Sequence, residues 1–346
     1  MTKYHIAGDG TVKPCRAKVK PCPLGGGHFD TVQLAEAYLK HKYSFVDEYN
    51  MNVNFGSPYK AINANKRGDF VEQETNQAIN DGLETHVTHY KNGSWIPERA
   101  KVHQEILEEM MKKYVNVPSD KKVVFSAGLP GAGKTTVLTQ YENLDTNDWA
   151  TVSSDDFKEI LAEKGMIPKI EGLTPMESST LVHEESSYLA DELLSKLSKQ
   201  GKNIIYDFTC KSEDSTIKRI DNLKKYDYET KDMQFVFVDI PIDTAKERAK
   251  HRYRNGLNNG IMNDYRNKEL TEQDRHSEQK VTLGGRHLPE YIIDNCKSEN
   301  NKTSSINAET LIKLHTGDLG LPQPIIYNNS GTEPVKKDYV DFLIRE

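Results

Sequence analysis

The chain has 346 residues, enough for about two or three domains, and its hydrophobic content of 36% is sufficient for an ordinary core. A formal net charge of −6 and a pI near 6.0 argue against a protein that binds along nucleic-acid backbone, so no such partner is expected. No run is apolar enough for a signal peptide or a bilayer span, which argues against a membrane partner. With only four cysteines, the chain is expected to carry reduced thiols in a cytoplasm.

The first 60 residues are predicted to be rich in loops. Prolines and glycines in Lys20–Gly27 exclude a helix or an interior strand, whereas His28–Tyr43 has the apolar stripe of a helix. Cysteines and histidines also gather here and could ligate a metal ion. The spacing between the cysteines differs from that of common zinc sites, so small buried thiols are preferred over zinc. The four candidate ligands are His5, Cys15, Cys22 and His28.

Residues 61–116 are predicted to form a helical lead-in segment. Residues 61–92 carry few strong signals. By contrast, Glu98–Tyr114 places apolar side chains on one helical face, with Pro97 at its start and Pro118 beyond its end. The segment is therefore expected to contain one clear helix directly before the next domain.

Residues 128–135, Gly-Leu-Pro-Gly-Ala-Gly-Lys-Thr, spell a phosphate-binding loop between a predicted buried strand, Lys122–Ala127, and a helix that starts at Thr136–Gln140. Glycines let successive backbone N–H groups surround a phosphate at a helix N-terminus. Lys134 would reach the β- and γ-phosphates, and the Thr135 hydroxyl would ligate Mg²⁺. A glycine turn with an incidental lysine is the alternative. The predicted contacts to ATP or GTP are Gly128, Gly131, Ala132, Gly133, Lys134, Thr135 and Thr136.

From this loop onward, strands and helices alternate, which predicts an α/β fold. It is a doubly wound parallel sheet of the P-loop NTPase type, preceded by an N-terminal, mainly helical and loop-rich extension. The domain should span residues 117–300, and residues 301–346 are assigned to a polar C-terminal extension. The predicted strands are Ala150–Ser153, Asn203–Phe208, Gln234–Ile240 and, in the tail, Pro324–Tyr327. The predicted helices are Ser178–Gln200 and Asp243–Tyr253.

Acidic residues follow three of these strands, where ligands of such sheets gather. Asp155 comes after the second strand, where a carboxylate suits a general base for a hydroxyl nucleophile, and a helix cap is the alternative. Asp207 ends an apolar strand, as required of a residue that coordinates Mg²⁺ directly or through water. Asp239 ends a similar strand and is the rival candidate.

Basic residues are dense between Lys246 and Arg254, and Arg286 lies further along the chain. On a helix, Arg248 and Arg252 would share a face. Most such charge runs are a solvated surface. Here the phosphate loop gives the arginines a target, because a transferring phosphoryl group needs cationic clamps. The guanine-reading motif of GTPases and the signature of transporter ATPases are absent from the sequence, so a small kinase is predicted.

Together with the phosphate loop, Ser154–Lys158 and Ser195–Lys211 resemble the zeta toxin kinases, and Gly285–Glu290 resembles the late arginine motif of that family. His89–His103 is similar to the lead-in helix of longer members encoded by phages or mobile elements. The resemblance spans about residues 120–295. It implies a toxin that uses ATP and Mg²⁺ to phosphorylate a sugar hydroxyl of UDP-N-acetylglucosamine, and an antitoxin as its protein partner.

By position, the resemblance assigns Lys134 to hold the phosphates and Asp155 to act as the base. It assigns Arg252 and Arg286 to the phosphate-clamping pair. In this family a separate antitoxin covers the nucleotide pocket with a helix, so Glu98–Tyr114 could do the same within one chain.

Asp207, Thr209 and Lys211 fall where the family organises substrate and metal. Phe208 stands where the family has glycine, and Lys211 stands where it usually has arginine. A lysine is a point charge rather than a planar fork, so these departures concern the acceptor rather than phosphoryl transfer. The alternatives are a polynucleotide 5′-kinase, another nucleotide kinase of the NAD type, and an ATP-binding module with little catalysis.

Overall fold

The structure is a computed structural model that describes residues 4–6, 12–14, 64–145, 147–253, 283–298 and 305–345. Several predictions concern residues outside these ranges: the loop Lys20–Gly27, the helix His28–Tyr43 and the cluster that contains Cys15, Cys22 and His28. The described part of the first 60 residues is an antiparallel pair, β1 (Tyr4–Ile6) and β2 (Val12–Pro14).

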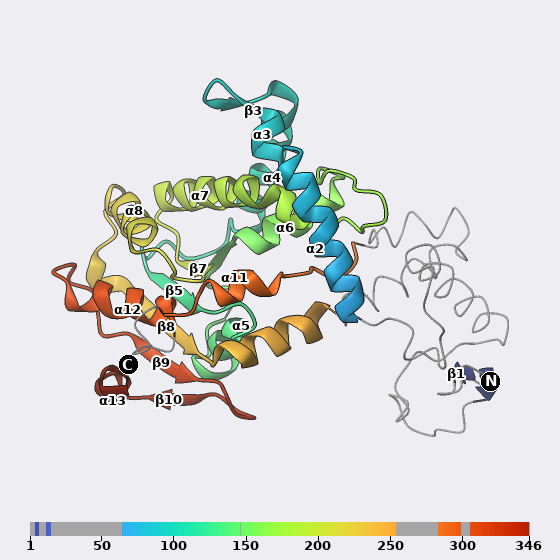
Figure 1. Cartoon of the computed structure of the whole chain (residues 1–346). Helices are drawn as coiled ribbons and strands as arrows, with labels where there is room; N and C mark the ends of the chain where they lie inside the picture. Colours follow the sequence, from blue (N-terminus) through green and yellow to red (C-terminus); the bar gives the residue numbers. More distant parts are fainter. Residues whose placement is uncertain are drawn as a thin grey trace.

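A six-stranded sheet lies at the centre of the molecule, in the order β10-β9-β8-β5-β7-β6 (Figure 1). Neighbouring strands are parallel except for β10, which pairs antiparallel with β9 at one edge. The predicted α/β fold with a doubly wound sheet is therefore confirmed. The strands are β5 (Val123–Gly128), β6 (Ala150–Ser153), β7 (Ile204–Phe208), β8 (Met233–Asp239), β9 (Ile325–Asn328) and β10 (Val335–Lys337).

The order of the strands puts the phosphate loop at the point where the chain changes direction across the sheet. After β5 the chain runs outward to β6, returns to β7 beside β5, and then crosses to β8 on the other side of β5. Ligands of such sheets bind at this switch point, outside the carboxyl ends of the strands. The loop that follows β5 therefore lies where a ligand is expected.

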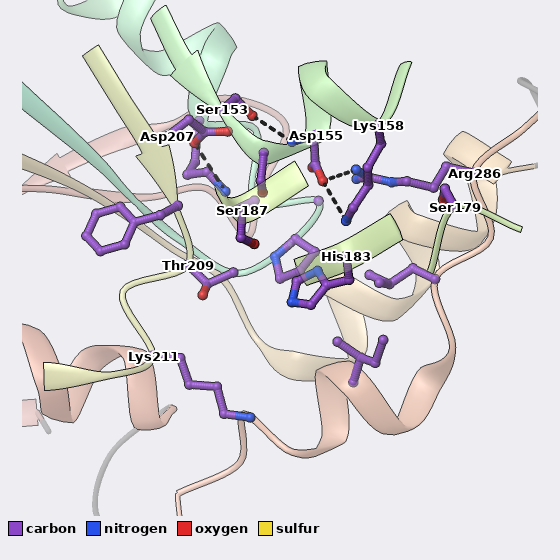
Figure 2. A pocket seen from close by; sticks show the side chains of 18 of the residues that line it. Ser153, Asp155, Lys158, Ser179, His183, Ser187, Asp207, Thr209, Lys211 and Arg286 are labelled. Carbon is purple, nitrogen blue, oxygen red and sulfur yellow. Dashed lines mark hydrogen bonds and ion pairs between the residues drawn. The ribbon is translucent and has the colours of Figure 1, made fainter. Parts of the chain in front are cut away.

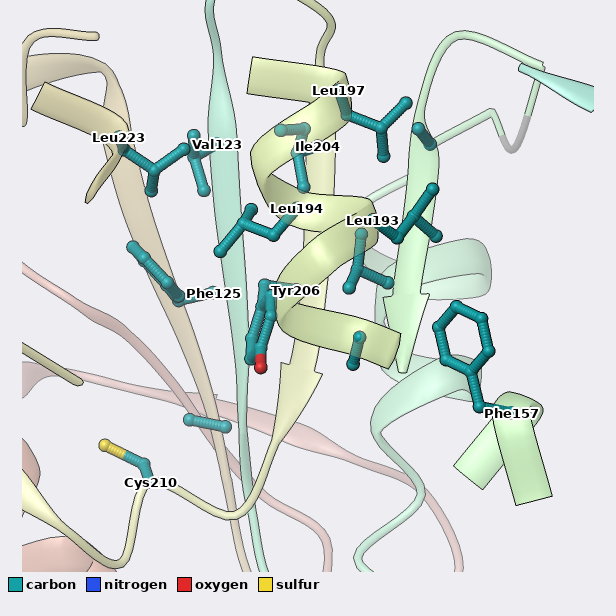
Figure 3. Close-up of a cluster of buried hydrophobic side chains, with 14 of the residues drawn as sticks. Val123, Phe125, Phe157, Leu193, Leu194, Leu197, Ile204, Tyr206, Cys210 and Leu223 are labelled. Atoms are coloured by element: carbon teal, nitrogen blue, oxygen red, sulfur yellow. The ribbon is translucent and has the colours of Figure 1, made fainter. Parts of the chain in front are cut away.

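Both faces of the sheet are covered, which is why its central strands read as continuous apolar runs. On one face, Leu193, Leu194 and Leu197 of α7 pack over Phe125 and Tyr206 of the sheet (Figure 3). This face is covered by α4 (Pro97–Lys113), α6 (Ser154–Glu163), α7 (His183–Lys199), α8 (Glu213–Lys224), α12 (Ile306–Thr316) and α13 (Tyr339–Arg345).

The opposite face is covered by the helical turn after the phosphate loop, by a helix over residues 242–253 and by α11 (Glu290–Asp294). The first of these differs from the regular helix predicted at Thr136–Gln140. It consists of a short α5 (Lys134–Thr136) that continues as a π-helix, η2 (Val137–Tyr141). Similarly, the predicted helix Ser178–Gln200 begins with a 3₁₀ turn, η3 (Ser179–Val182).

The lead-in segment packs against the central domain. The predicted helix Glu98–Tyr114 is present as α4, which packs on α7 through Ile106, Leu107 and Met110. It is preceded by α2 (Ala64–Asn80), α3 (Thr85–His89) and a small hairpin of β3 (Tyr90–Lys91) and β4 (Ser94–Trp95). Of these, α2 contacts η3.

The C-terminal residues 305–345 extend the same sheet, because β9 pairs with β8 and α12 places Leu311 and Leu314 in the core. We therefore propose that they belong to one domain with residues 117–300, in place of the separate extension assigned from composition. A short 3₁₀ turn, η4 (Thr230–Asp232), precedes β8. No helix among the described residues has the length and apolar character to span a bilayer.

Candidate active site

A cavity of about 970 Å³ opens at the carboxyl ends of β5, β6 and β7. Its walls come from the phosphate loop, the first turn of α6, the loop after β7, the helix over residues 242–253 and residues 286–288. The structure brings together there all the predicted site residues except Gly128. They are Gly131, Ala132, Gly133, Lys134, Thr135, Thr136, Asp155, Asp207, Thr209, Lys211, Arg252 and Arg286.

The phosphate loop is shaped by close backbone approaches that only glycine permits. Gly128 has φ 140°, and a Cβ there would lie 2.4 Å from the carbonyl oxygen of Val238. Gly133 has φ 85° and precedes the first residue of α5, so the loop leads directly into a helix N-terminus. Asn329, just after β9, donates from Nδ2 to the carbonyl of Ala132 at 2.7 Å. No local motif marks Asn329, which lies far along the chain from the phosphate loop.

Lys134 and Asp207 both line the cavity and form an ion pair there. Lys134 Nζ lies 3.6 Å from Asp207 Oδ1 and donates to the carbonyl of Gly128 at 3.2 Å. Burial raises the pKa of Asp207, although the charge of Lys134 opposes this shift. The rival Asp239 does not line the cavity.

Asp207 and Thr135 fit the ligand chemistry of Mg²⁺. Asp207 Oδ1 is buried and accepts no hydrogen bond from the part of the chain that the structure describes. A carboxylate oxygen of this kind and a hydroxyl beside a phosphate loop are ligands that Mg²⁺ takes in such folds. Within the described ranges, no group of three or more His, Cys, Asp or Glu side chains converges to hold a metal ion.

Asp155 lies in the first turn of α6, whose N-cap is the Ser153 side chain. It is therefore not the capping residue. Its carboxylate pairs with Arg286 and with Lys158, whose Nζ is 3.3 Å away (Figure 2). Burial alone would raise the pKa of Asp155, but these cations and Arg252 hold it well below its usual range. Lys158 was not predicted, although its i, i+3 spacing from Asp155 is a local signal that could have identified it.

Arg252 and Arg286 bring positive charge to one side of the cavity. Burial and the nearby charge of Arg286 both lower the pKa of Arg252, as expected where two cations share a space. An anion between them would relieve this repulsion. Arg248 also lines the cavity, and its guanidinium donates to the carbonyl of Asn329 at 2.7 Å. Arg254, the last of the predicted basic run, lies outside the described residues.

The loop after β7 forms a second wall, with Thr209 and Lys211 on either side of Cys210. Cys210 is buried and has φ 60°, which turns the chain between them. Helix α12 fixes this turn, because Asn307 Nδ2 donates to the Thr209 carbonyl at 2.5 Å and Thr310 Oγ1 to the Lys211 carbonyl at 3.2 Å.

The two neighbours of Thr209 in the chain, Phe208 and Cys210, pack into the interior of the protein. Phe208 packs its ring on those of Phe125 and Tyr206, at centroid distances of 5.8 and 5.6 Å, although it also borders the cavity. Burial raises the pKa of the Cys210 thiol to about 12, so it stays protonated. Cys210 and Cys296 are both free and buried.

The beginning of α7 supplies polar groups that sequence reasoning did not find. His183 and Ser187 project between Thr209 and the Asp155–Lys158 pair (Figure 2). Burial and the charge of Lys158 lower the pKa of His183, so its imidazole is neutral near pH 7. These groups can donate and accept hydrogen bonds without adding charge, which suits contacts to hydroxyls.

The structure contradicts the hypothesis that Glu98–Tyr114 covers the nucleotide pocket. No residue of α4 lines the large cavity, and its apolar face packs on α7. Only its C-terminal end, at Lys113 and Tyr114, reaches a second cavity of about 680 Å³, which shares Thr135 and Asp207 with the first. The hypothesis rested only on the position of this helix before the nucleotide-binding domain. The packing of its side chains on α7 contradicts it.

Asp156 faces this second cavity, and we expect its ionisation to cost stability. Burial, together with the charges of Glu159 and Asp207, raises its pKa from 3.8 to about 6. The folded chain therefore holds the proton more tightly than the unfolded chain, so stability falls as pH rises through this window. Asp156→Asn should raise the free energy of unfolding by ~1–2 kcal/mol above about pH 6 and not below about pH 4. Urea unfolding at both pH values checks this, and an equal effect at both would contradict it.

The phosphate loop at the switch point of a parallel sheet, with lysine, aspartates and arginines around one cavity, defines a P-loop protein of the kinase-like class. The family model described as Zeta toxin matches residues 106–311, more than half of the chain. The chain therefore belongs to the zeta toxin family, whose members are P-loop kinase-like toxins, and the resemblance seen in the sequence is confirmed.

Solved structures similar to this chain include AvrRxo1-ORF1:AvrRxo1-ORF2 with sulphate ions, at 18% identity and a TM-score of 0.48 over 73% of this chain and 70% of that one. The same pair with ATP is 17% identical, with a TM-score of 0.47 over 71% and 68%. The PezAT chromosomal toxin–antitoxin system of Streptococcus pneumoniae is 14% identical, with a TM-score of 0.42 over 68% and 80%. No curated protein matches the chain.

Proposed function

We propose that this protein is an ATP-dependent kinase that transfers the γ-phosphoryl group to a hydroxyl of a nucleotide sugar such as UDP-N-acetylglucosamine, and that it acts as a toxin. The observation that carries the proposal is the meeting of Lys134, Asp155, Arg252 and Arg286 around one cavity of about 970 Å³. Cavities that bind whole ligands are typically about 300–1,000 Å³, so there is room for the ends of a donor and an acceptor together.

The donor half of the site is the phosphate loop. Its backbone N–H groups and the N-terminus of α5 would bind the β-phosphate, and Lys134 would leave its contacts with Gly128 and Asp207 for the β- and γ-phosphates. Thr135 and Asp207 would hold Mg²⁺, which neutralises charge on the β- and γ-phosphate oxygens when it is bound.

Asp155 would be the catalytic base. Its carboxylate is ionised and can orient the acceptor hydroxyl. Once Arg252 and Arg286 bind the transferring phosphoryl group, the carboxylate loses two of the cations that lower its pKa and becomes a better base for the hydroxyl proton. As the bond from that oxygen to the γ-phosphorus forms, the bond to the departing ADP breaks. Arg252 and Arg286 would bind the equatorial oxygens, where charge is spread in the transition state.

The acceptor half would comprise the loop after β7 and the start of α7. Thr209 and Lys211 offer a hydroxyl and a cation, and His183 and Ser187 offer neutral hydrogen-bonding groups. Such a wall suits an acceptor with hydroxyls and a phosphate. Lysine in place of the family's arginine gives weaker geometric selection of that phosphate. A separate antitoxin protein is the proposed partner of the toxin.

The nucleotide part of the proposal is tested by thermal unfolding with and without Mg-ATP. A ligand at about 100 times its Kd stabilises the folded state by ~2.7 kcal/mol, so Mg-ATP should raise the melting temperature of the full chain by several degrees. Lys134→Met should remove most of this rise, whereas Lys196→Met, on the exposed side of α7, should keep it. No rise in the wild type, or the same rise in Lys134→Met, would refute binding at this loop.

A further inference from the structure

Helix α2 lies outside the residues that the family model matches, yet its buried Arg67 binds Glu177, which also binds Tyr253, the residue after the cavity arginine Arg252. We propose that Arg67 and Glu177 form the centre of a buried network that positions Arg252 and Arg286. The lead-in segment would then be part of the phosphoryl-transfer site. This inference rests on the proposed function, because it assigns a role to the support of the two cavity arginines.

Glu177 is the hub of the network. Its side chain is completely buried, and that of Arg67 is 6% exposed. Arg67 Nε donates to Oε1 at 2.9 Å and Nη2 to Oε2 at 2.7 Å. The Thr174 backbone N–H and hydroxyl donate to Oε2 at 2.9 and 3.1 Å, and the Tyr253 hydroxyl donates to Oε1 at 2.6 Å. Five donors thus hold both carboxylate oxygens of Glu177. These directional bonds define the position of the Glu177 side chain more narrowly than an apolar contact would.

Two members of the network directly follow the two cavity arginines. Tyr253 is buried and follows Arg252. His287 follows Arg286, and its ring lies edge-on to Tyr253 at a centroid distance of 5.0 Å. Displacing Glu177 would therefore move the residue beside each arginine.

Helix α2 also supports His287 directly. Gly68 approaches it so closely that a Cβ there would lie 2.8 Å from His287 Nε2. The ends of the two arginine-bearing segments are therefore packed against each other and against α2, through its consecutive residues Arg67 and Gly68.

Residues 283–289 depend on such contacts because they form no helix or strand of their own. The backbone N–H of Met176 donates to the Leu283 carbonyl at 2.9 Å, next to the Glu177 hub. Segments without regular structure are held by tertiary contacts and open readily without them. Loss of the Arg67–Glu177 pair should therefore displace Arg286 more than it displaces the phosphate loop, which β5 and α5 hold.

The chain provides a matched control in a second buried pair, Arg99 and Glu185. Arg99 Nε and Nη2 each donate to the Glu185 carboxylate at 2.7 Å, and the exposed fractions are 7% and 0%, close to those of Arg67 and Glu177. This pair joins α4 to α7 and not to the arginine-bearing segments. Loss of either arginine removes the cation from a fully buried carboxylate and so costs stability. Glu177 keeps its bonds from Thr174 and Tyr253, and Glu185 keeps its contact with His103 Nε2 at 2.6 Å.

The test measures the Kd of Mg-ADP for the full chain, with and without aluminium fluoride, which mimics the phosphoryl group in transfer. The melting temperature of each variant is measured as well. In the wild type, aluminium fluoride should lower the Kd of Mg-ADP. The factor by which it does so is called the gain, and Arg252→Ala should abolish it. Arg67→Met should reduce the gain by roughly 10- to 100-fold with ADP affinity alone unchanged. Tyr253→Phe, which keeps the ring against His287, should reduce it less, and Arg99→Met should melt earlier but keep the gain.

A full gain in folded Arg67→Met, or an equal loss in Arg99→Met, would overturn the inference while leaving the proposed function intact. If Arg67→Met does not fold, Tyr253→Phe decides: an unchanged gain overturns the inference and a reduced gain supports it. No gain in the wild type, or a full gain in Arg252→Ala, would overturn the proposed function and this inference with it.

Discussion

Replacing Asp155 with asparagine is expected to reduce phosphoryl transfer by about 10²- to 10⁴-fold, the contribution typical of a general base. Asparagine has nearly the same size but cannot take the proton of the acceptor hydroxyl. It also removes the negative charge that pairs with Arg286 and Lys158. Binding of Mg-ATP should change little, because the phosphate loop provides the nucleotide contacts. The rate of γ-phosphate transfer and the Kd of Mg-ATP together check this.

The neighbouring carboxylate provides the control for that experiment. Asp156→Asn makes the same chemical change one residue further along α6, at a side chain that faces the second cavity. It should leave the transfer rate within a few-fold of the wild type. Unchanged transfer in Asp155→Asn would contradict the assignment of the base, and a large loss in Asp156→Asn alone would reassign it.

Disrupting the contact between α4 and α7 is expected to unfold the domain rather than to activate it. Ile106 is fully buried in the main hydrophobic core. An ionised aspartate there would have no partner, so Ile106→Asp should lower the free energy of unfolding by at least ~4 kcal/mol, a large part of the ~5–15 kcal/mol of a native domain. Deletion of residues 1–115, which removes this helix, should give insoluble or unfolded protein. Denaturant unfolding and circular dichroism measure both effects.

The same substitution at an exposed position controls for the added charge. Val115 lies two residues after the end of α4 and is 64% exposed, so Val115→Asp should change stability by less than ~0.5 kcal/mol. A folded and more active protein after deletion of residues 1–115 would contradict the packing described for α4 and restore the hypothesis of an inhibitory helix.

The parts of the fold that follow from local sequence were predictable. The central strands are apolar on both faces, so they appear as continuous hydrophobic runs, and the phosphate loop is a contiguous motif. Helix α12 was missed because Ala308, Leu311 and Leu314 are its main core contacts in a polar stretch. Helix α2 was missed for a similar reason: its buried contacts include a charged arginine, Arg67, whose partner Glu177 is distant in the sequence.

In the site, too, the residues placed by sheet topology were predictable, and the contacts between residues distant in the sequence were not. The topology of a parallel sheet accounts for the convergence of Lys134, Asp155 and Asp207, since residues after parallel strands meet at one edge. The pairing of Asp155 with Arg286 could not be derived, because it depends on where residues 283–289 pack. Asn329 gives no motif at all, and only the position of β9 brings it to the phosphate loop.

The most direct test of the proposed kinase is to incubate the full chain with Mg-ATP and a panel of nucleotide sugars, NAD and single-stranded oligonucleotides, and to measure the mass of each product. We expect UDP-N-acetylglucosamine or a related nucleotide sugar to gain one phosphate, with no gain in the presence of the Lys134→Met protein. Labelling of oligonucleotide 5′ ends or of NAD would change the acceptor class. Conversion of ATP to ADP and phosphate with no phosphorylated acceptor in the panel would contradict the proposed kinase.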